Sequence, residues 1–186
     1  MCSNAVKSSG LLLAAVAVMS VSAATAQPGD DVVRERQRDM KAVAAAAKSI
    51  DAVFKGTSPY DARAFKSAAE TIRAFSGKRL SELFAGPVVA EGSKASANIE
   101  AERPTFDKLA TELGAYAEAL SVAADRNPDV LAPDMRMHGV DARMGGPLAK
   151  RNSAMPDPMS MSAEHAFHLM LQVCTSCHAK FRTKDN

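Results

Sequence analysis

The chain has 186 residues, of which 47% are hydrophobic but only 5% aromatic, and its formal net charge at neutral pH is +2. This length suits one domain with a sizeable core, and a composition rich in alanine and poor in aromatic residues favours helices over sheets. The near-neutral charge gives no sign of a basic nucleic-acid-binding face, so we expect no nucleic acid among its partners.

Residues 1–26 have the features of a cleaved secretory signal peptide. Lys7 supplies a positive charge, an apolar run covers Leu11 to Met19, and Ala24-Thr25-Ala26 matches the small-x-small cleavage pattern. The apolar run is too short for a comfortable membrane span. We therefore expect a periplasmic mature chain of residues 27–186 without a membrane span, from which Cys2 has been removed.

Four later segments carry apolar residues at spacings of three and four, which predicts amphipathic helices. The predicted helices cover residues 31–55, 59–76, 104–126 and 162–182. Gly56 and Gly77 are expected to end the first two, Ser58 and Pro59 to begin the second, and Ser162 to cap the last. With no strand pattern in between, the sequence predicts an all-α fold, an up-and-down four-helix bundle.

Two connections interrupt the predicted helices. Residues 78–103 form a looser stretch, and residues 129–160 form a long segment rich in proline, glycine and methionine without a sustained period. This second segment and its edge hold several soft metal ligands: Met135, Met137, His138, Met144, Met155, Met159 and Met161. Thioethers with imidazole suit copper(I), but methionine is also an adaptable filler, and a flexible loop is the simpler interpretation.

The motif that carries chemistry is Cys174-Thr175-Ser176-Cys177-His178, in the last predicted helix. Cys-x-x-Cys-His is the signature of c-type haem attachment. Residues i, i+3 and i+4 share one face of a helix, so both thiols can reach the two vinyl groups of one haem edge while the imidazole points at the iron. The motif predicts one covalent haem c with His178 as an axial ligand.

Three alternatives use the same residues. A thioredoxin-like dithiol requires a βαβ context and a helix N-terminus, and neither is predicted here. A zinc site could add His165 and His168 to Cys174 and Cys177, but pairs two turns apart on one helix cannot surround one ion. A disulfide would close a very small loop and gain little entropy.

With these residues in place, the chain resembles the class II c-type cytochromes, the cytochrome c′ and cytochrome c556 family. Two stretches carry the resemblance: the haem motif continued through Phe181 and Arg182, and Arg36-Gln37-Arg38-Asp39-Met40-Lys41 in the first helix. The segment from Ser93 to Glu100 also resembles the lead into the family's third helix, although Glu100 stands where the family often has an aromatic residue. The loop before the last helix is longer than usual in the family.

The resemblance implies roles for two residues of the first helix. Met40 stands at the position that faces the haem, where c556-like members have a methionine ligand and cytochrome c′ members leave the iron five-coordinate. Arg36 stands where the family's arginine approaches a haem propionate. From the residues alone, Met40 could be a core methionine and Arg36 a solvated charge. Arg182 could tune the proximal side or simply complement the helix dipole.

Our sequence-based interpretation is therefore a periplasmic electron carrier, not an enzyme, with one covalent haem c and His178/Met40 ligation. It would exchange electrons with redox partner proteins, and the resemblance implies a possible homodimer through the first two helices. The main alternative is a five-coordinate, cytochrome c′-like protein that binds nitric oxide or carbon monoxide. Copper trafficking through the methionine-rich segment is a third possibility.

Overall fold

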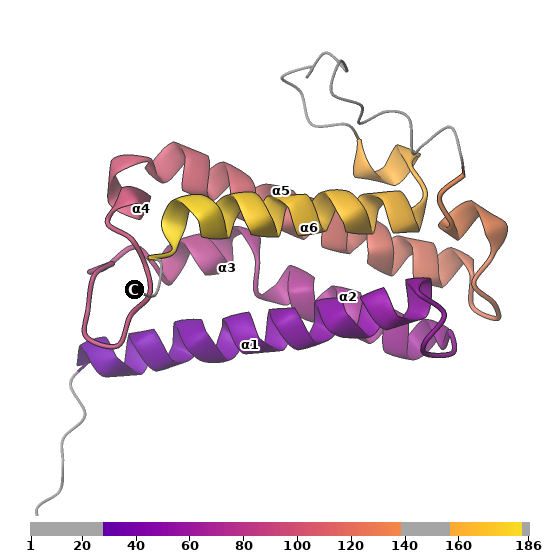
Figure 1. Cartoon of the computed structure of the whole chain (residues 1–186), viewed down its shortest axis with the longest axis horizontal. Coiled ribbons are helices and arrows are strands. Elements are labelled where there is room, and N and C mark those ends of the chain that lie inside the picture. The colour runs from indigo at the N-terminus through magenta and orange to yellow at the C-terminus, as the bar shows by residue number, and fades with distance from the viewer. Residues whose placement is uncertain (1–27, 139–156, 184–186) are drawn as a thin grey trace, which may run out of the picture.

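The structure is a computed structural model that describes residues 28–138 and 157–183. The predicted signal peptide, Met144 and Met155 lie outside these residues. Four long helices make up the body: α1 (Pro28–Phe54), α2 (Ala62–Ala74), α5 (Arg103–Arg126) and α6 (Ala163–Phe181). Each runs antiparallel to the next, α2 packs on both α1 and α5, and α5 packs on α6 (Figure 1). The predicted all-α four-helix bundle is confirmed.

Shorter elements fill the connections between the long helices. Helices α3 (Gly77–Glu82) and α4 (Asn98–Ala101) lie between α2 and α5, and 3-10 turns η1 (Pro133–Met135) and η3 (Pro158–Ser160) flank the undescribed part of the α5–α6 connection. The described residues form no strand, only an isolated bridge between Ala95 and Arg182. The stretch that we predicted to be loose thus contains two short helices.

The residues that end α1 and begin α6 are the predicted ones, whereas the residue that begins α2 is not. Gly56 follows α1 with a φ of 70°, and Ser162 caps α6 by accepting a hydrogen bond from His165 N, both as predicted. Helix α2 instead begins after Asp61, whose carboxylate accepts a hydrogen bond from Ala64 N at 2.7 Å. Ser58 and Pro59 therefore lie in the preceding turn, because a carboxylate is at least as good an N-cap as a serine.

Gly77 does not simply end α2, as we predicted, but opens the next helix. Phe75 is the C-cap of α2 and Ser76 the N-cap of α3. Gly77 has a φ of 56°, a left-handed conformation that favours glycine. The chain turns there without a longer loop, so α3 continues alongside α5.

Buried apolar residues fall into two groups. The larger, here called the packed cluster, joins α1, α2, α5 and α6 and includes fully buried Ile50, Ile72, Leu120, Phe167 and Met170. The smaller, here called the pocket cluster, consists of Leu80, Val88, Ile99, Phe106, Ala110 and Phe181. Phe54 contacts both Phe65 and Phe167 within the packed cluster, with ring centroids 5.5 and 5.6 Å apart.

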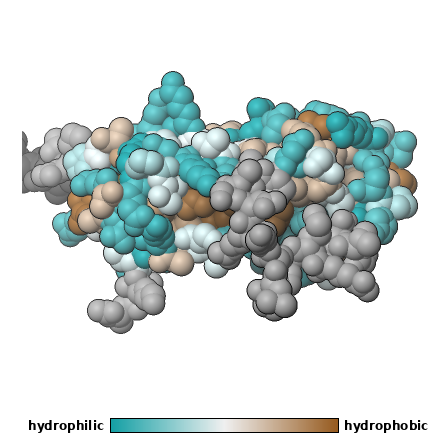
Figure 2. All heavy atoms as spheres, turned by 90° about the horizontal axis from the view of Figure 1, so that it is seen from above, coloured by the Kyte–Doolittle hydropathy of each residue, from teal (hydrophilic) through white to brown (hydrophobic). Residues whose placement is uncertain are grey.

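The surface of the described residues is mostly hydrophilic on the face shown in Figure 2. Seen from above, hydrophilic side chains dominate its visible part, and apolar atoms show as smaller patches in the centre and towards both ends (Figure 2). In the described ranges the large exposed apolar residues are scattered: Val32, Val89, Val130 and Met159. No helix among these residues is long and apolar enough to cross a membrane.

Candidate functional site

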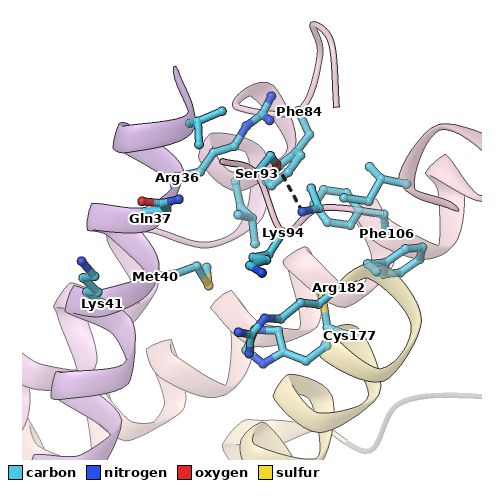
Figure 3. Close-up of a pocket in the computed structure, with 16 residues that line it drawn as sticks. Arg36, Gln37, Met40, Lys41, Phe84, Ser93, Lys94, Phe106, Cys177 and Arg182 are labelled. Atoms are coloured by element: carbon cyan, nitrogen blue, oxygen red, sulfur yellow. Dashed lines mark hydrogen bonds between the residues drawn. The ribbon is translucent and has the colours of Figure 1, made fainter. Parts of the chain in front are cut away.

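A cavity of about 370 Å³ opens between the first half of α1 and the end of α6. It lies where the backbones of these two helices stay apart, while each packs firmly on another helix. Its volume falls in the ordinary range for cofactor sites, roughly 300–1,000 Å³. Arg36, Met40, Cys177 and His178 all line it, so the structure brings together four of the five residues that the sequence singled out (Figure 3).

Apolar side chains provide much of the remaining wall. They come from α1, α3, the turn after α3, α4, α5 and the end of α6: Val33, Leu80, Phe84, Ile99, Phe106 and Phe181. The ring of Phe106 meets those of Phe84 and Phe181 edge-on, at centroid distances of 5.1 and 5.4 Å. A flat, largely apolar macrocycle fits such a wall by its chemistry, because burying its faces here removes apolar surface from water on both sides.

The three motif residues lie on the last two turns of α6. Cys177 packs against the pocket cluster, whereas Cys174, one turn earlier, packs against the packed cluster and does not line the cavity. Both cysteines are free thiols. Burial raises the pKa of both, that of Cys177 to about 11 with a further contribution from Cys174.

These protonation states discriminate between the alternatives. Reactive dithiols have a lowered thiol pKa, so the raised values argue against a thioredoxin-like role. Burial, and then the charge of Arg182, lower the pKa of His178. A neutral imidazole is the form that binds metals, and the site favours it.

The described residues do not provide the set of ligands that a zinc site requires. His165 and His168 lie on α6 before the cysteines, and His168 is exposed. In residues 28–138 and 157–183, no three side chains of His, Cys, Asp or Glu come close enough to hold a metal ion. Residues of one straight helix spaced by two turns cannot converge, as the spacing indicated.

Met40 reaches the cavity from α1, on the other side from the motif. Its half-buried side chain packs against the pocket cluster and points from α1 into the space toward Arg182 and Cys177 (Figure 3). The preceding residue, Asp39, is only 2% exposed and pairs with Arg79 of α3 at 2.8 Å. This ion pair fixes α1 against α3 beside Met40, and sequence patterns gave no sign of it because aspartate is seldom buried.

Arg36 has other partners than the predicted one. Its guanidinium donates hydrogen bonds to the carbonyls of Leu83, Pro87 and Val88 at 2.8, 3.1 and 3.3 Å. It also lies 4.2 Å from the ring centre of Phe84. The side chain is 6% exposed and its burial lowers the pKa. No carboxylate pairs with it within the described residues, so a buried positive charge stands in the cavity wall, and the propionate contact stays a prediction.

Residues 83–97, here called the strap, cross one side of the cavity from α1 to the end of α6. On the α1 side Gln37 donates to Gly92 O at 3.0 Å, in addition to the bonds of Arg36. On the α6 side Thr183 N donates to Lys94 O, and Ser96 N to Phe181 O, each at 2.9 Å. The sequence did not reveal the strap, because its bonds to both helices use backbone atoms of the strap itself.

Comparisons with known proteins agree with this geometry. A sequence model of the family described as Cytochrome C′ matches residues 31–141, well over half of the chain. The match ends before α6, so the Cys-x-x-Cys-His motif is an independent observation. A search of the curated proteins found no match.

Solved structures share the fold. Cytochrome c prime from Shewanella frigidimarina superposes with a TM-score of 0.58 at 21% identity, over 86% of this chain and 100% of that one. Cytochrome c′ from Thermochromatium tepidum gives 0.59 at 19% identity, over 85% and 98%. The nitric oxide complex of a variant of cytochrome c prime from Alcaligenes xylosoxidans gives 0.56 at 22% identity, over 83% and 96%.

Proposed function

The chain belongs to the cytochrome c′ family, and on that premise we propose that it is a periplasmic haem c protein that binds a diatomic gas in the cavity between α1 and α6. Proteins of this family carry covalently attached haem c. The observation that carries the proposal is the convergence of Cys177 and His178 on α6 and Met40 on α1 on one largely apolar cavity. Haem iron supplies reversible ligand binding and one-electron chemistry.

The residues of the motif have distinct proposed roles. Cys174 and Cys177 provide the two thioether sulfurs, and His178 provides the axial nitrogen. The shared face of α6 supports this assignment, as does the neutral imidazole that the site favours. Cys174 lies at the border of the packed cluster, so its thioether would anchor the cofactor to the rigid part of the bundle.

Met40 decides between the two functions that the sequence left open. Gas binding requires Met40 to pack beside the iron without occupying its sixth position. The cytochrome c′ relationship supports this version over our first interpretation, the six-coordinate electron carrier, and one structural neighbour is described as a nitric oxide complex. The apolar wall around Met40 also suits a small uncharged ligand.

Electron transfer with His178/Met40 ligation is the second candidate, favoured by one observation. Met40 lines the cavity from α1, whereas His178 lines it from α6. A thioether is a recognised axial ligand that raises haem potential. Redox partner proteins, a dimer through α1 and α2, and cleavage after residue 26 remain predictions under either function.

Copper trafficking receives no such support. Met135 is 1% exposed and belongs to the packed cluster, and Met161 packs against the same cluster. These two methionines are used as apolar filler, the role that the simpler interpretation gave to the segment.

Optical spectra of the exported, haem-loaded protein test the proposal. We expect a covalent haem with a high-spin ferrous spectrum that shifts on addition of carbon monoxide, and little change in Met40→Leu. Met159→Leu is a matched control, because Met159 is exposed and does not line the cavity. A low-spin spectrum that ignores the gas and becomes high-spin only in Met40→Leu would establish the electron carrier instead.

A further inference from the structure

Among the described residues, the charges that line the cavity are all of one sign. Arg36, Lys41, Lys94 and Arg182 contribute to its wall, and no aspartate or glutamate in residues 28–138 and 157–183 does. The whole chain carries a net charge of only +2, so this concentration of cations is a local property of the site. A wall to which several cations contribute has a positive potential, which favours an anionic ligand group.

Lys94 is distinguished among these cations by how its backbone is held. Its carbonyl accepts a hydrogen bond from Thr183 N at 2.9 Å, and the next residue, Ala95, bridges to Arg182. Two residues earlier in the chain, Gly92 O accepts from Gln37 of α1 at 3.0 Å. The strap is thus fastened on both sides of Lys94, to the two helices between which the cavity opens.

The Lys94 side chain enters the space between these helices. In Figure 3 it lies between Met40 of α1 and Arg182 of α6, below the ring of Phe84. The guanidinium of Arg36 donates to three strap carbonyls. The ammonium group of a lysine stands on a flexible stem and has three donors, so it can turn toward an incoming carboxylate.

We propose that Lys94 is a cofactor-binding residue that forms an ion pair with a propionate carboxylate of the haem. The inference rests on the proposed function, since it needs a haem in this cavity. Arg36 then acts mainly as a positioning residue: it holds the strap, and the strap presents Lys94. The positive charge of Lys94 near the cofactor stabilises the reduced form, because reduction removes one positive charge from the iron.

The experiment measures the reduction potential of the haem-loaded protein and its pH dependence in Lys94→Gln, Lys94→Arg and Lys55→Gln. Lys55 is a matched control: it follows α1 about 22 Å along the helix from Met40 and pairs with Asp51 on the exposed surface. Lys94→Gln should shift the equilibrium about three- to tenfold toward the ferric form, tenfold being 59 mV for one electron. It should also move the propionate titration, seen in the pH dependence, to higher pH.

Two comparisons make the result specific. Lys94→Arg should retain most of both properties, and Lys55→Gln should leave both unchanged. A shift of potential without any shift of the titration would mean that Lys94 acts as a distant charge, and would overturn the ion pair. A change of spin state in Lys94→Gln would place Lys94 at the iron and overturn it as well.

Haem content separates this inference from the proposed function. If Lys94→Gln carries covalent haem at the wild-type level but keeps the wild-type potential and titration, the inference on Lys94 is overturned and the proposed function stands. If the wild-type protein carries no covalent haem, the proposed function falls and this inference with it.

Discussion

The interior of the bundle is filled with side chains at one end and contains a cavity at the other. At the end where α1 meets α2, the packed cluster fills the interior with side chains such as Phe167 and Ile50, both completely buried. At the other end the pocket cluster surrounds a cavity of about 370 Å³. The packed end is held by side-chain contacts across its interior, whereas the side chains at the pocket end line a cavity.

The means of fastening differ accordingly. The packed end uses side-chain contacts, among them the aromatic rings of Phe54, Phe65 and Phe167. The pocket end uses the Asp39–Arg79 ion pair and hydrogen bonds to the backbone of the strap. Polar bonds at fixed points keep the walls apart without filling the space between them. The cavity is therefore a built feature of the fold.

Phenylalanine-to-alanine substitutions should give the largest difference in the free energy of unfolding between the two ends. Phe167→Ala should lower the free energy of unfolding by about 3–5 kcal/mol, with or without haem, because it opens a hole in a closed core. Phe106→Ala in the pocket cluster should cost clearly less in the haem-free chain and more in the loaded one. Urea unfolding of both forms measures this, and equal losses at the two positions would contradict it.

Removal of the Arg36 guanidinium, which holds the strap by three hydrogen bonds, has the next largest expected effect. Arg36→Met should lower the free energy of unfolding by about 2 kcal/mol, since three carbonyls lose a charged donor while one buried charge is relieved. Residues 83–97 should also become easier to cleave by protease. Arg34→Met on the same helix, whose side chain is 60% exposed, is the control and should change little. Wild-type protease resistance in Arg36→Met would show that the strap is held by its α6 side alone.

A substitution where α5 passes the α2–α3 corner should have a smaller effect. A Cβ on Gly114 would lie 2.8 Å from Oγ of Ser76, which donates a hydrogen bond to Arg73 O at 2.7 Å. Gly114→Ala should therefore cost about 1 kcal/mol, the clash outweighing the gain in helix propensity. Adding Ser76→Ala should recover part of this loss in a double-mutant cycle. Strictly additive effects would mean that the two sites do not touch.

The smallest expected effect is the pH dependence of the free energy of unfolding in the haem-free chain. The pKa of His178 is lowered in the folded chain by burial and then by Arg182, so the unfolded chain binds a proton more readily. In Cys174→Ser/Cys177→Ser, stability should therefore be complete above about pH 6.5, the ordinary histidine pKa, and decline as pH falls below it. Adding His178→Gln should weaken this dependence, which urea unfolding at pH 5 and pH 8 can measure.

Sequence patterns predicted those parts of the molecule that depend on spacing along one helix. The four long helices followed from apolar periodicity, and the motif on α6 followed from the i, i+3, i+4 relation of its residues. Contacts between distant segments were not visible. The strap, the buried Asp39 and the partners of Arg36 depend on backbone carbonyls or on pairs some 40 or more residues apart, and neither leaves a periodic trace.

The choice between ligation states shows a second limit. The sequence predicted that Met40 faces the cofactor, and the structure places Met40 in the wall of the same cavity as His178. Whether its sulfur bonds to iron depends on differences in position far smaller than a helix turn. The family relationship favours the gas-binding function. The identity of the residue at position 40 alone does not distinguish the two functions.

The hydrogen bonds that Arg36 donates to the strap also affect how the sequence of the strap can diverge during evolution. Three of the partners of Arg36 are main-chain oxygens, at Leu83, Pro87 and Val88, and Gln37 likewise binds the main chain at Gly92. An oxygen of this kind is present whichever amino acid the gene encodes there. The exposed side chains between positions 85 and 91 can thus drift, whereas the buried Val88 and the two anchors on α1 stay under selection. Related genes should therefore pair an invariant arginine with a partner segment in which most positions change.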